Sequence, residues 1–478
     1  MTDLGGNAWF ATGHGVGLIE RRPITLPEKA KFFEDEIDAR HRRTPYQYVD
    51  AVVLKRPGDK SEWTQRDSDN DGLWTAMYGA AECYAFAATG DPLAKKRAQA
   101  AFDALWFLRE VTQGGPHPAA PGFVARTILP TDGRDPNVRD SSPEEFERMR
   151  QRDGLWKKIT PRWPVSADGK WYWKSDTSSD ELDGHFFFYG VYYDLVTKSE
   201  EEKRRVREQV AAIADHLIDH GFTLVDHDGK PTRWGIFDPA HLNHDPNWWP
   251  ERGLNSLSIL AYLKVAEHVT GSTKYREAAR TLIEQHSYDQ NVLIPKTNAG
   301  PGSGNQSDDE MAFMDYYNLI RYESDPVLQR KYSVSFFHYW IMERQELNPL
   351  FNFMYAATNT GKSSRGPFEL QDLSPTGNWL GDSIDTLRRY PLDRVNWRLT
   401  NSHRKDIVPL PDYVREVGER GVGHRRDGTV LPIDERYVDH WNHNPWQLDQ
   451  GGNGQSLADG ASFLLPYYMG LYHKFIEN

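Results

Sequence analysis

The chain has 478 residues, with 57 lysines and arginines against 69 aspartates and glutamates and a single cysteine. Its net charge of −12 opposes binding to nucleic acids and anionic membranes, and one cysteine excludes an internal disulfide and a zinc–thiolate site. No apolar run reaches the roughly 18 residues of a membrane-spanning helix. Aromatic residues make up 13% of the chain, with 16 tryptophans, more than an average core needs. Sugar-binding clefts use such rings.

Residues 1–24 are predicted to form an extended strand segment, and residues 25–478 a single domain. The stretch from Gly5 to Val16 resembles the blade repeat of two-component-regulator β-propellers, in a single copy. The resemblance implies the remnant of a preceding propeller, or a chain trimmed from a longer secreted parent. An ordinary edge strand is the alternative. We therefore expect a periplasmic or secreted location.

The main domain repeats one pattern: an apolar helix, a short polar turn, and a helix with one polar face. A helix that is apolar all round is buried, whereas a striped helix faces solvent. The pattern predicts an all-α domain, an (α/α)6- or (α/α)7-type toroid with short β-hairpins in its mouth loops. A last inner helix from Asp459 to Ile476 lacks a following partner, which Leu26–Arg42 is expected to supply. The other inner helices are predicted to start at Asp71, Asp183, Arg252 and Asp308.

Inner helices that enter in the same direction place their N-termini around one mouth, where the long loops lie. The Asp228-Gly229 turn predicts a hairpin among these loops. Many tryptophans fall in the loops rather than in the helices. We expect them to ring one cleft: Trp163, Trp171, Trp173, Trp234, Trp248, Trp249, Trp397, Trp441 and Trp446.

The segment Asp67–Gly72 matches the first half of a calcium loop, but the closing position is Tyr78 rather than glutamate. No metal and no cofactor is therefore expected, with calcium as the alternative. Asp71 is expected to cap the first inner helix. Asp71 and Trp74 are also predicted to bind substrate.

The densest polar cluster runs from Asp176 to His185. His185 and Tyr189 are four residues apart and share a helix face, so they are predicted to form a catalytic acid–base pair. The alternative is a core histidine beside a core tyrosine. Asp183 is a predicted substrate ligand, and its spacing from Asp180 predicts that one carboxyl pKa is raised by the other charge.

Two further segments carry binding candidates. Trp248, Arg252 and Asn255 lead into the third inner helix, and Arg252 and Asn255 suit a carboxylate or a hydroxyl-rich ligand. His241 and His244 lack a third metal ligand. The alternative for Arg252 is packing of its own loop.

A local basic island lies near the C-terminus, within an acidic protein. His403 and Arg404 are predicted catalytic residues, and Trp441 and Asn442 predicted substrate ligands. Arginine recognises carboxylates with two parallel hydrogen bonds, so the island suits an acidic sugar. A solvated surface patch is the alternative.

Together the helix pairs and the segments Ser175–His185, Arg233–Asn255 and Asn401–Asp406 resemble the α/α-toroid carbohydrate-active enzymes. The likeness covers most of the chain, without the catalytic signature of one family. It implies a polysaccharide or oligosaccharide substrate and a polysaccharide lyase acting on uronates, such as a rhamnose–glucuronate lyase. Elimination would use His185 or His403 as base and Tyr189 as acid. Carboxylate neutralisation would fall to Asn255 or Arg252, with Arg404.

Two alternatives remain open. A glycoside hydrolase would need two carboxyl groups flanking the scissile bond, from the inner-helix starts Asp71, Asp183, Asp309 and Asp459. A noncatalytic glycan-binding module would present tryptophans, with no titratable groups converging in the cleft.

Overall fold

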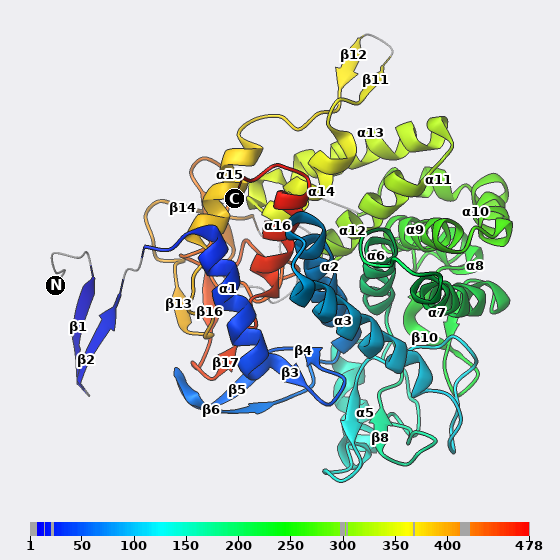
Figure 1. The fold of residues 1–478 in the computed structure, drawn as a ribbon, viewed down its shortest axis with the longest axis horizontal. Coiled ribbons are helices and arrows are strands. Elements are labelled where there is room, and N and C mark those ends of the chain that lie inside the picture. Colours follow the sequence, from blue (N-terminus) through cyan, green and yellow to red (C-terminus); the bar gives the residue numbers. More distant parts are fainter. Residues whose placement is uncertain are drawn as a thin grey trace.

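The computed structural model describes residues 7–13, 15–20, 23–296, 302, 305–366, 369–411 and 421–477. These residues form an α/α toroid in which an inner ring of helices is wrapped by an outer ring (Figure 1). The inner helices are α2 (Asp71–Thr89), α6 (Ser179–Leu195), α9 (Arg252–Thr270), α12 (Ser307–Tyr322), α14 (Pro349–Asn359) and α16 (Ala461–Tyr472). The outer helices are α1 (Leu26–Glu36), α3 (Pro92–Glu110), α7 (Glu200–Asp219), α10 (Thr273–His286), α13 (Pro326–Glu343) and α15 (Trp379–Arg389). The predicted toroid is confirmed, and the described residues give it six pairs.

The ring closes because each inner helix packs on the next and α16 packs on α2. Outer helix α1 packs on α16, as expected for the N-terminal partner of the last inner helix. The inner helices are apolar on almost all sides, whereas α7 buries one stripe, Val206, Val210, Ile213 and Leu217. A helix with one apolar face buries only that face and therefore lies in the outer ring, whereas a helix that is apolar on all sides lies in the inner ring.

Short strands and helices fill the loops. The strands pair as β1–β2, β3–β4, β7–β8, β9–β10, β11–β12, β13–β16 and β14–β15, with a three-stranded sheet in the order β17–β5–β6. Their bounds are β1 Ala8–Thr12, β2 Gly15–Ile19, β3 Arg42–Arg43, β4 Tyr48–Val49, β5 Val52–Arg56, β6 Asp59–Gln65, β7 Ile128–Pro130, β8 Trp171–Trp173, β9 Thr223–Val225, β10 Pro231–Ile236, β11 Ser363–Arg365, β12 Leu370–Asp372, β13 Arg398–Thr400, β14 Ile407–Pro409, β15 Gly423–Arg425, β16 Asp449–Gly451 and β17 Ser456–Leu457. The short helices are α4 Asn137–Asp140, α5 Pro143–Arg152, α8 Pro239–His244, α11 Tyr288–Asn291, a π-helix Ile37–His41 and a 3-10 helix Arg344–Glu346. The predicted hairpin at Asp228-Gly229 is the pair β9–β10.

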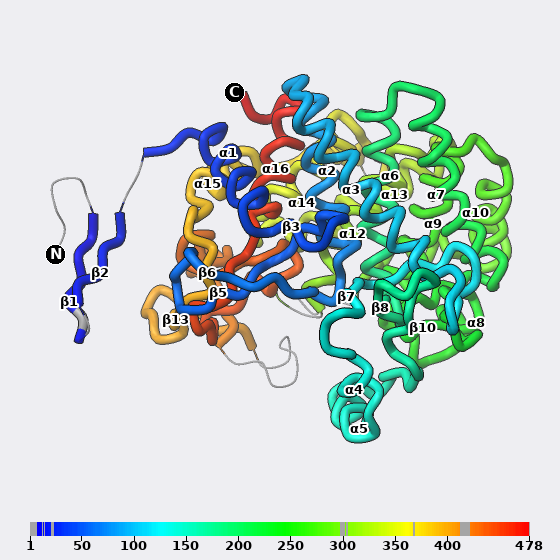
Figure 2. Tube along the Cα trace, turned by 60° about the horizontal axis from the view of Figure 1, so that its bottom comes forward, coloured from blue at the N-terminus to red at the C-terminus, as the bar shows by residue number. Residues whose placement is uncertain are grey.

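The hairpin β1–β2 stands away from the toroid in both views (Figures 1 and 2). It lies within the segment 1–24 that was predicted to be extended, and the proposed propeller origin of that segment stays a prediction. Among the described residues, no helix is both long and apolar enough to cross a membrane. The expected periplasmic or secreted location also stays a prediction.

The start of α9 packs tightly on a loop that leads toward the mouth. A Cβ added at Gly253 would lie 1.8 Å from the carbonyl oxygen of Ile294 and 2.7 Å from Cα of Pro295. Because both contacts are backbone, Gly253→Ala is expected to lower the free energy of unfolding by about 1–3 kcal/mol. Gly154→Ala is the matched control, since nothing lies within 4 Å of its added Cβ. Denaturant unfolding followed by circular dichroism tests this, and equal midpoints for the two variants would contradict it.

Candidate active site

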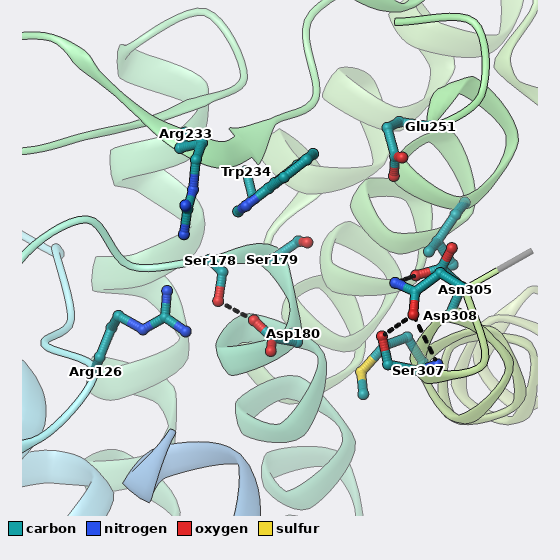
Figure 3. A pocket seen from close by; sticks show the side chains of 12 residues that line it. Arg126, Ser178, Ser179, Asp180, Arg233, Trp234, Glu251, Asn305, Ser307 and Asp308 are labelled. Carbon is teal, nitrogen blue, oxygen red and sulfur yellow. Dashed lines mark hydrogen bonds between the residues drawn. The ribbon is translucent and has the colours of Figure 1, made fainter. Parts of the chain in front are cut away.

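A pocket of about 280 Å³ opens at the N-terminal ends of α6, α9 and α12 (Figure 3). Three inner helices therefore deliver their first residues to one place, as a toroid mouth requires. The pocket is lined by Arg126, Ser178, Ser179, Asp180, Arg233, Trp234, Glu251, Leu254, Asn305, Ser307, Asp308 and Met311.

Asp180, the second residue of α6, projects into this pocket as a fixed hydrogen-bond acceptor. Its carboxylate accepts from Nδ2 of Asn70 at 2.7 Å, from the backbone N–H of Glu181 at 3.1 Å and from the hydroxyl of Ser178. The side-chain oxygen Oδ1 of Asn70 in turn accepts a hydrogen bond from Nη2 of Arg126 at 2.5 Å. Arg126 therefore sets the orientation of the Asn70 amide, and the amide orients the Asp180 carboxylate.

Asp308 and Glu251 face the pocket from the other side (Figure 3). Asp308 is the second residue of α12, and its Oδ1 accepts from Nδ2 of Asn305 at 2.8 Å. Burial raises the pKa of Asp308 well above its usual range, and the negative charges of Glu251 and Asp309 raise it further, whereas Lys296 opposes the shift. Burial also raises the pKa of Glu251. The pocket thus has an anchored acceptor on one wall and, on the other, two acids whose pKa values are raised.

A buried ion-pair network lies beneath Asp308. Nζ of Lys296 donates to both oxygens of Asp309, at 2.9 and 2.7 Å. Among the described residues, the carboxylates of Asp309, Glu343 and Glu346 bring ligand atoms within 4.8 Å of one another, a spacing that a metal ion can use. Because the Lys296 ammonium already binds Asp309, the cluster has its own cation, and we assign it to an ion-pair network.

In the calcium-like segment Asp67–Gly72, two carboxylates are likewise paired with arginine and lysine side chains of the protein. Asp69 pairs with Arg126 at 3.2 Å and with Lys174. Asp71 is fully buried and accepts from Arg43 and from the hydroxyl of Thr127. The expected cap is wrong, because Asn70 takes the N-cap position of α2 and Asp71 is its first helical residue. The Asp71 carboxylate instead fixes the loop that carries Thr127 and Arg126.

The predicted acid–base pair lies inside the helical wall. His185 and Tyr189 both have 0% exposure, and Nδ1 of His185 and the Tyr189 hydroxyl are 2.7 Å apart. The hydroxyl also accepts from Nε2 of Gln209 at 2.9 Å. Burial lowers the pKa of His185 to about 3, so the ring is neutral. The two side chains contact each other rather than the pocket.

Two predicted ligands on the inner helices are also buried. Trp74 packs face to face on His440, with ring centroids 3.7 Å apart and planes 8° apart. Asp183 is 1% exposed and accepts from the hydroxyl of Tyr262. Burial raises the pKa of Asp183 to about 7, and the charge of Asp180 adds to the shift. The helix α6 starts at Ser179, so Asp183 lies one turn inside the helix rather than at the mouth.

The remaining predicted residues lie around the pocket without lining it. Asn255 is buried and donates to the carbonyl of Ile236 at 2.9 Å, Trp248 is 8% exposed, and Arg252 is exposed.

The C-terminal candidates are dispersed as well. Arg404 pairs with Asp406 at 2.7 Å and with Glu435, while His403 is exposed and Asn442 half-buried. The Trp441 indole N–H donates to the carbonyl of Ser462 at 2.7 Å inside the core.

The loop tryptophans do not ring one cleft. Trp234 lines the pocket, but Trp163, Trp173 and Trp446 are at most 2% exposed. Trp446 belongs to a separate small core of the C-terminal loops. The prediction failed because several of these rings are used in packing: Trp173, Trp248 and Trp441 belong to the main hydrophobic core.

No protein-family model and no curated protein matches the sequence. Among solved structures, the chain is similar to the α-1,6-mannanase GH76A from Salegentibacter sp. HEL1_6, with a TM-score of 0.28 and 12% identity over 68% of this chain and 88% of that one. An inactive variant of the Salegentibacter enzyme in complex with α-1,6-mannotriose gives a TM-score of 0.27 and 12% identity over 73% and 95%. A glycoside hydrolase family 76 mannosidase from Bacteroides thetaiotaomicron VPI-5482 gives 0.27 and 13% over 74% and 92%.

The prediction of a uronate-cleaving lyase is wrong. The solved structures named above are an α-1,6-mannanase and a glycoside hydrolase family 76 mannosidase, and none of them is a lyase. The geometry agrees, because a base and an acid must come within hydrogen-bond reach of the sugar, and His185 and Tyr189 are buried away from the pocket. The acid–base groups that do converge in the pocket are the carboxyl groups of Asp180, Glu251 and Asp308.

Proposed function

We propose that the chain is a glycoside hydrolase that cleaves an oligosaccharide or polysaccharide in the pocket at the starts of α6, α9 and α12. The observation that carries this proposal is the opposition of Asp180 to Asp308 and Glu251 across one pocket (Figure 3). Glycosidic cleavage needs one carboxyl group that donates a proton and one carboxylate on the other side of the bond. The convergence of titratable groups also disfavours a noncatalytic binding module.

Asp308 is assigned as the general acid. Because its pKa is raised, Asp308 keeps its proton to a higher pH than an ordinary aspartate, and Asn305 fixes one of its oxygens at 2.8 Å. In the reaction Asp308 protonates the glycosidic oxygen while the bond from that oxygen to the anomeric carbon breaks. The developing positive charge on the sugar is stabilised by the carboxylate on the opposite wall.

Asp180 is assigned as that carboxylate. It acts either as a base that deprotonates an attacking water, which inverts the anomeric carbon, or as a nucleophile that forms a glycosyl–enzyme bond and leads to retention. Proton NMR of the first product anomer distinguishes the two. The half-buried ring of Trp234 lines the same pocket and offers an apolar surface on which a sugar face can stack.

Incubation with a panel of glycans tests the proposal. We expect new reducing ends without the ultraviolet absorbance of an unsaturated sugar, and we expect Asp308→Asn to slow their release strongly. Reducing ends released equally by wild type and by Asp308→Asn would contradict it.

The alkaline limb of the pH profile tests the acid assignment. Activity needs protonated Asp308, so it is expected to fall as the pH rises through the raised pKa of that group. The charge of Glu251 helps to raise this pKa, so Glu251→Gln is expected to move the limb to lower pH, by roughly one unit. Glu284→Gln on the outer helix α10 is the control. An alkaline limb that stays in place in Glu251→Gln, or moves to higher pH, would rule out Asp308 as a general acid whose pKa is raised by Glu251.

A further inference from the structure

Arg233 on β10 presents a buried guanidinium to the pocket with most of its donors unused (Figure 3). Its side chain is 10% exposed. Among the described residues it donates one hydrogen bond, from Nη1 to Asp153. Within the part of the chain that the structure describes, its Nε has no hydrogen-bond partner and lies 4.0 Å from Oδ2 of Asp176. Because a guanidinium carries five N–H donors, this group lacks acceptors that a ligand could supply.

Aromatic rings hold this guanidinium in place. It lies over the Trp156 ring at 4.5 Å and over the Trp234 ring at 5.6 Å. Arg162 also lies over Trp156, at 4.2 Å. A side chain held in this way loses little conformational entropy when it binds a ligand. The site is therefore preorganised.

A second guanidinium lines the same pocket. Arg126 and Arg233 extend toward each other on the wall that also carries Asp180 (Figure 3). The pKa of Arg233 is lowered by burial, and the charges of Arg126 and Arg162 lower it further, whereas Asp176 and Asp153 oppose the shift. Arg126 is already paired with Asp69 at 3.2 Å and donates to Asn70. Among the described residues it is therefore Arg233 that offers an anion its unused donors, and Arg126 adds a second positive charge at the same wall.

We propose that the pocket takes a sugar that carries an oxyanion substituent, a carboxylate or a sulfate ester, bound between Arg233 and Arg126. The identification of the ligand as a sugar rests on the proposed hydrolase function. The planar fork of arginine matches the paired oxygens of such groups. Trp234, next to Arg233, then receives the sugar face, and the scissile bond lies toward Asp308.

Binding of monosaccharides tests the inference without any bond cleavage. The probes are glucose, galactose and mannose, each compared with its 6-carboxylate and its 6-sulfate by calorimetric titration of the wild-type chain. At least one anionic form is expected to bind about 10-fold or more tightly than its neutral partner, and the two anionic forms distinguish carboxylate from sulfate. Equal affinities, or no binding of any anionic form, would overturn the inference.

Variants of Arg233 test whether this residue causes the preference for anionic over neutral sugars. Arg233→Met is expected to remove it, and Arg233→Lys, which keeps the charge but loses the fork, to reduce it at least about threefold. Arg276→Met on the surface of α10 is the control. Thermal melts check folding, and if Arg233→Met does not fold, Arg233→Lys decides. A preference unchanged in Arg233→Lys would overturn the inference.

The two proposals fail separately. Hydrolysis of glycans with no anionic preference in binding would reject the anion site and keep the hydrolase. An Arg233-dependent anionic preference with no hydrolysis of any glycan would keep the anion site and reject the hydrolase.

Discussion

Asp308→Asn is expected to lower kcat by about 1,000-fold, because the amide cannot donate the proton that the leaving oxygen needs. The loss should depend on the leaving group. Aryl glycosides whose phenolate leaves without protonation should lose much less activity than natural glycans, while KM stays within a few-fold. Initial rates across a series of aryl leaving groups measure this.

Asp385→Asn is the matched control, since Asp385 lies on outer helix α15 with its side chain 65% exposed. Its rates should equal those of wild type. An equal loss for every leaving group in Asp308→Asn would contradict the general-acid assignment, because removal of a structural carboxyl makes no such distinction.

Removal of the Asp180 carboxylate, as in Asp180→Gly, is expected to cost at least about 1,000-fold in kcat, because the group that attacks or activates water is lost. Added azide should restore activity by occupying the vacated space and bonding to the anomeric carbon, which gives a glycosyl azide. The configuration of that product shows which face the carboxylate normally serves.

Chemical rescue separates a catalytic role from a structural one. Mass spectrometry detects the glycosyl azide directly. Asp180→Gly with wild-type melting behaviour, no activity and no azide product would contradict the assignment. Asn70→Ala, which removes the donor at 2.7 Å from Asp180, is expected to lower kcat more mildly, because the carboxylate keeps its other two donors.

The helical rings were predictable from residue pattern. The first inner helices are apolar on nearly all sides, and the outer helices that follow them each have one apolar and one polar face. This difference distinguishes the two layers without any tertiary information. Inner helix α14 and outer helix α15 escaped prediction, although Asn348 caps α14 and Pro349 takes its first position, which is a usable helix-start signal. The pairing of α16 with α1 was predictable because no outer helix follows the last inner helix in the chain, which leaves the N-terminal helix as its partner.

The site was harder to predict because it depends on where α6 starts. The predicted start at Asp183 placed that residue at the mouth, but α6 begins at Ser179, one turn earlier. The sequence carried a usable signal, since Ser178 and Glu181 have the serine-x-x-glutamate spacing of a helix start. That signal places Asp180 in the first turn and Asp183 inside the helix.

The roles of histidine and tyrosine could not be read from spacing alone. Four-residue spacing put His185 and Tyr189 on one helix face, correctly, but did not say which way the face points. In the structure that face packs against Gln209 of α7, toward the outer ring. Glu251 escaped notice because it precedes α9 in a loop, and its role depends on the approach of Asp308 from another helix.

The most direct measurement of the central claim is the mass of the products formed from a cleaved glycan in ¹⁸O-enriched water. Hydrolysis at the pocket predicts saturated products in which each cleaved bond has gained one ¹⁸O at the new reducing end, and Asp308→Asn should form these products far more slowly. Products lighter by one water, with a carbon–carbon double bond and no ¹⁸O, would contradict the claim.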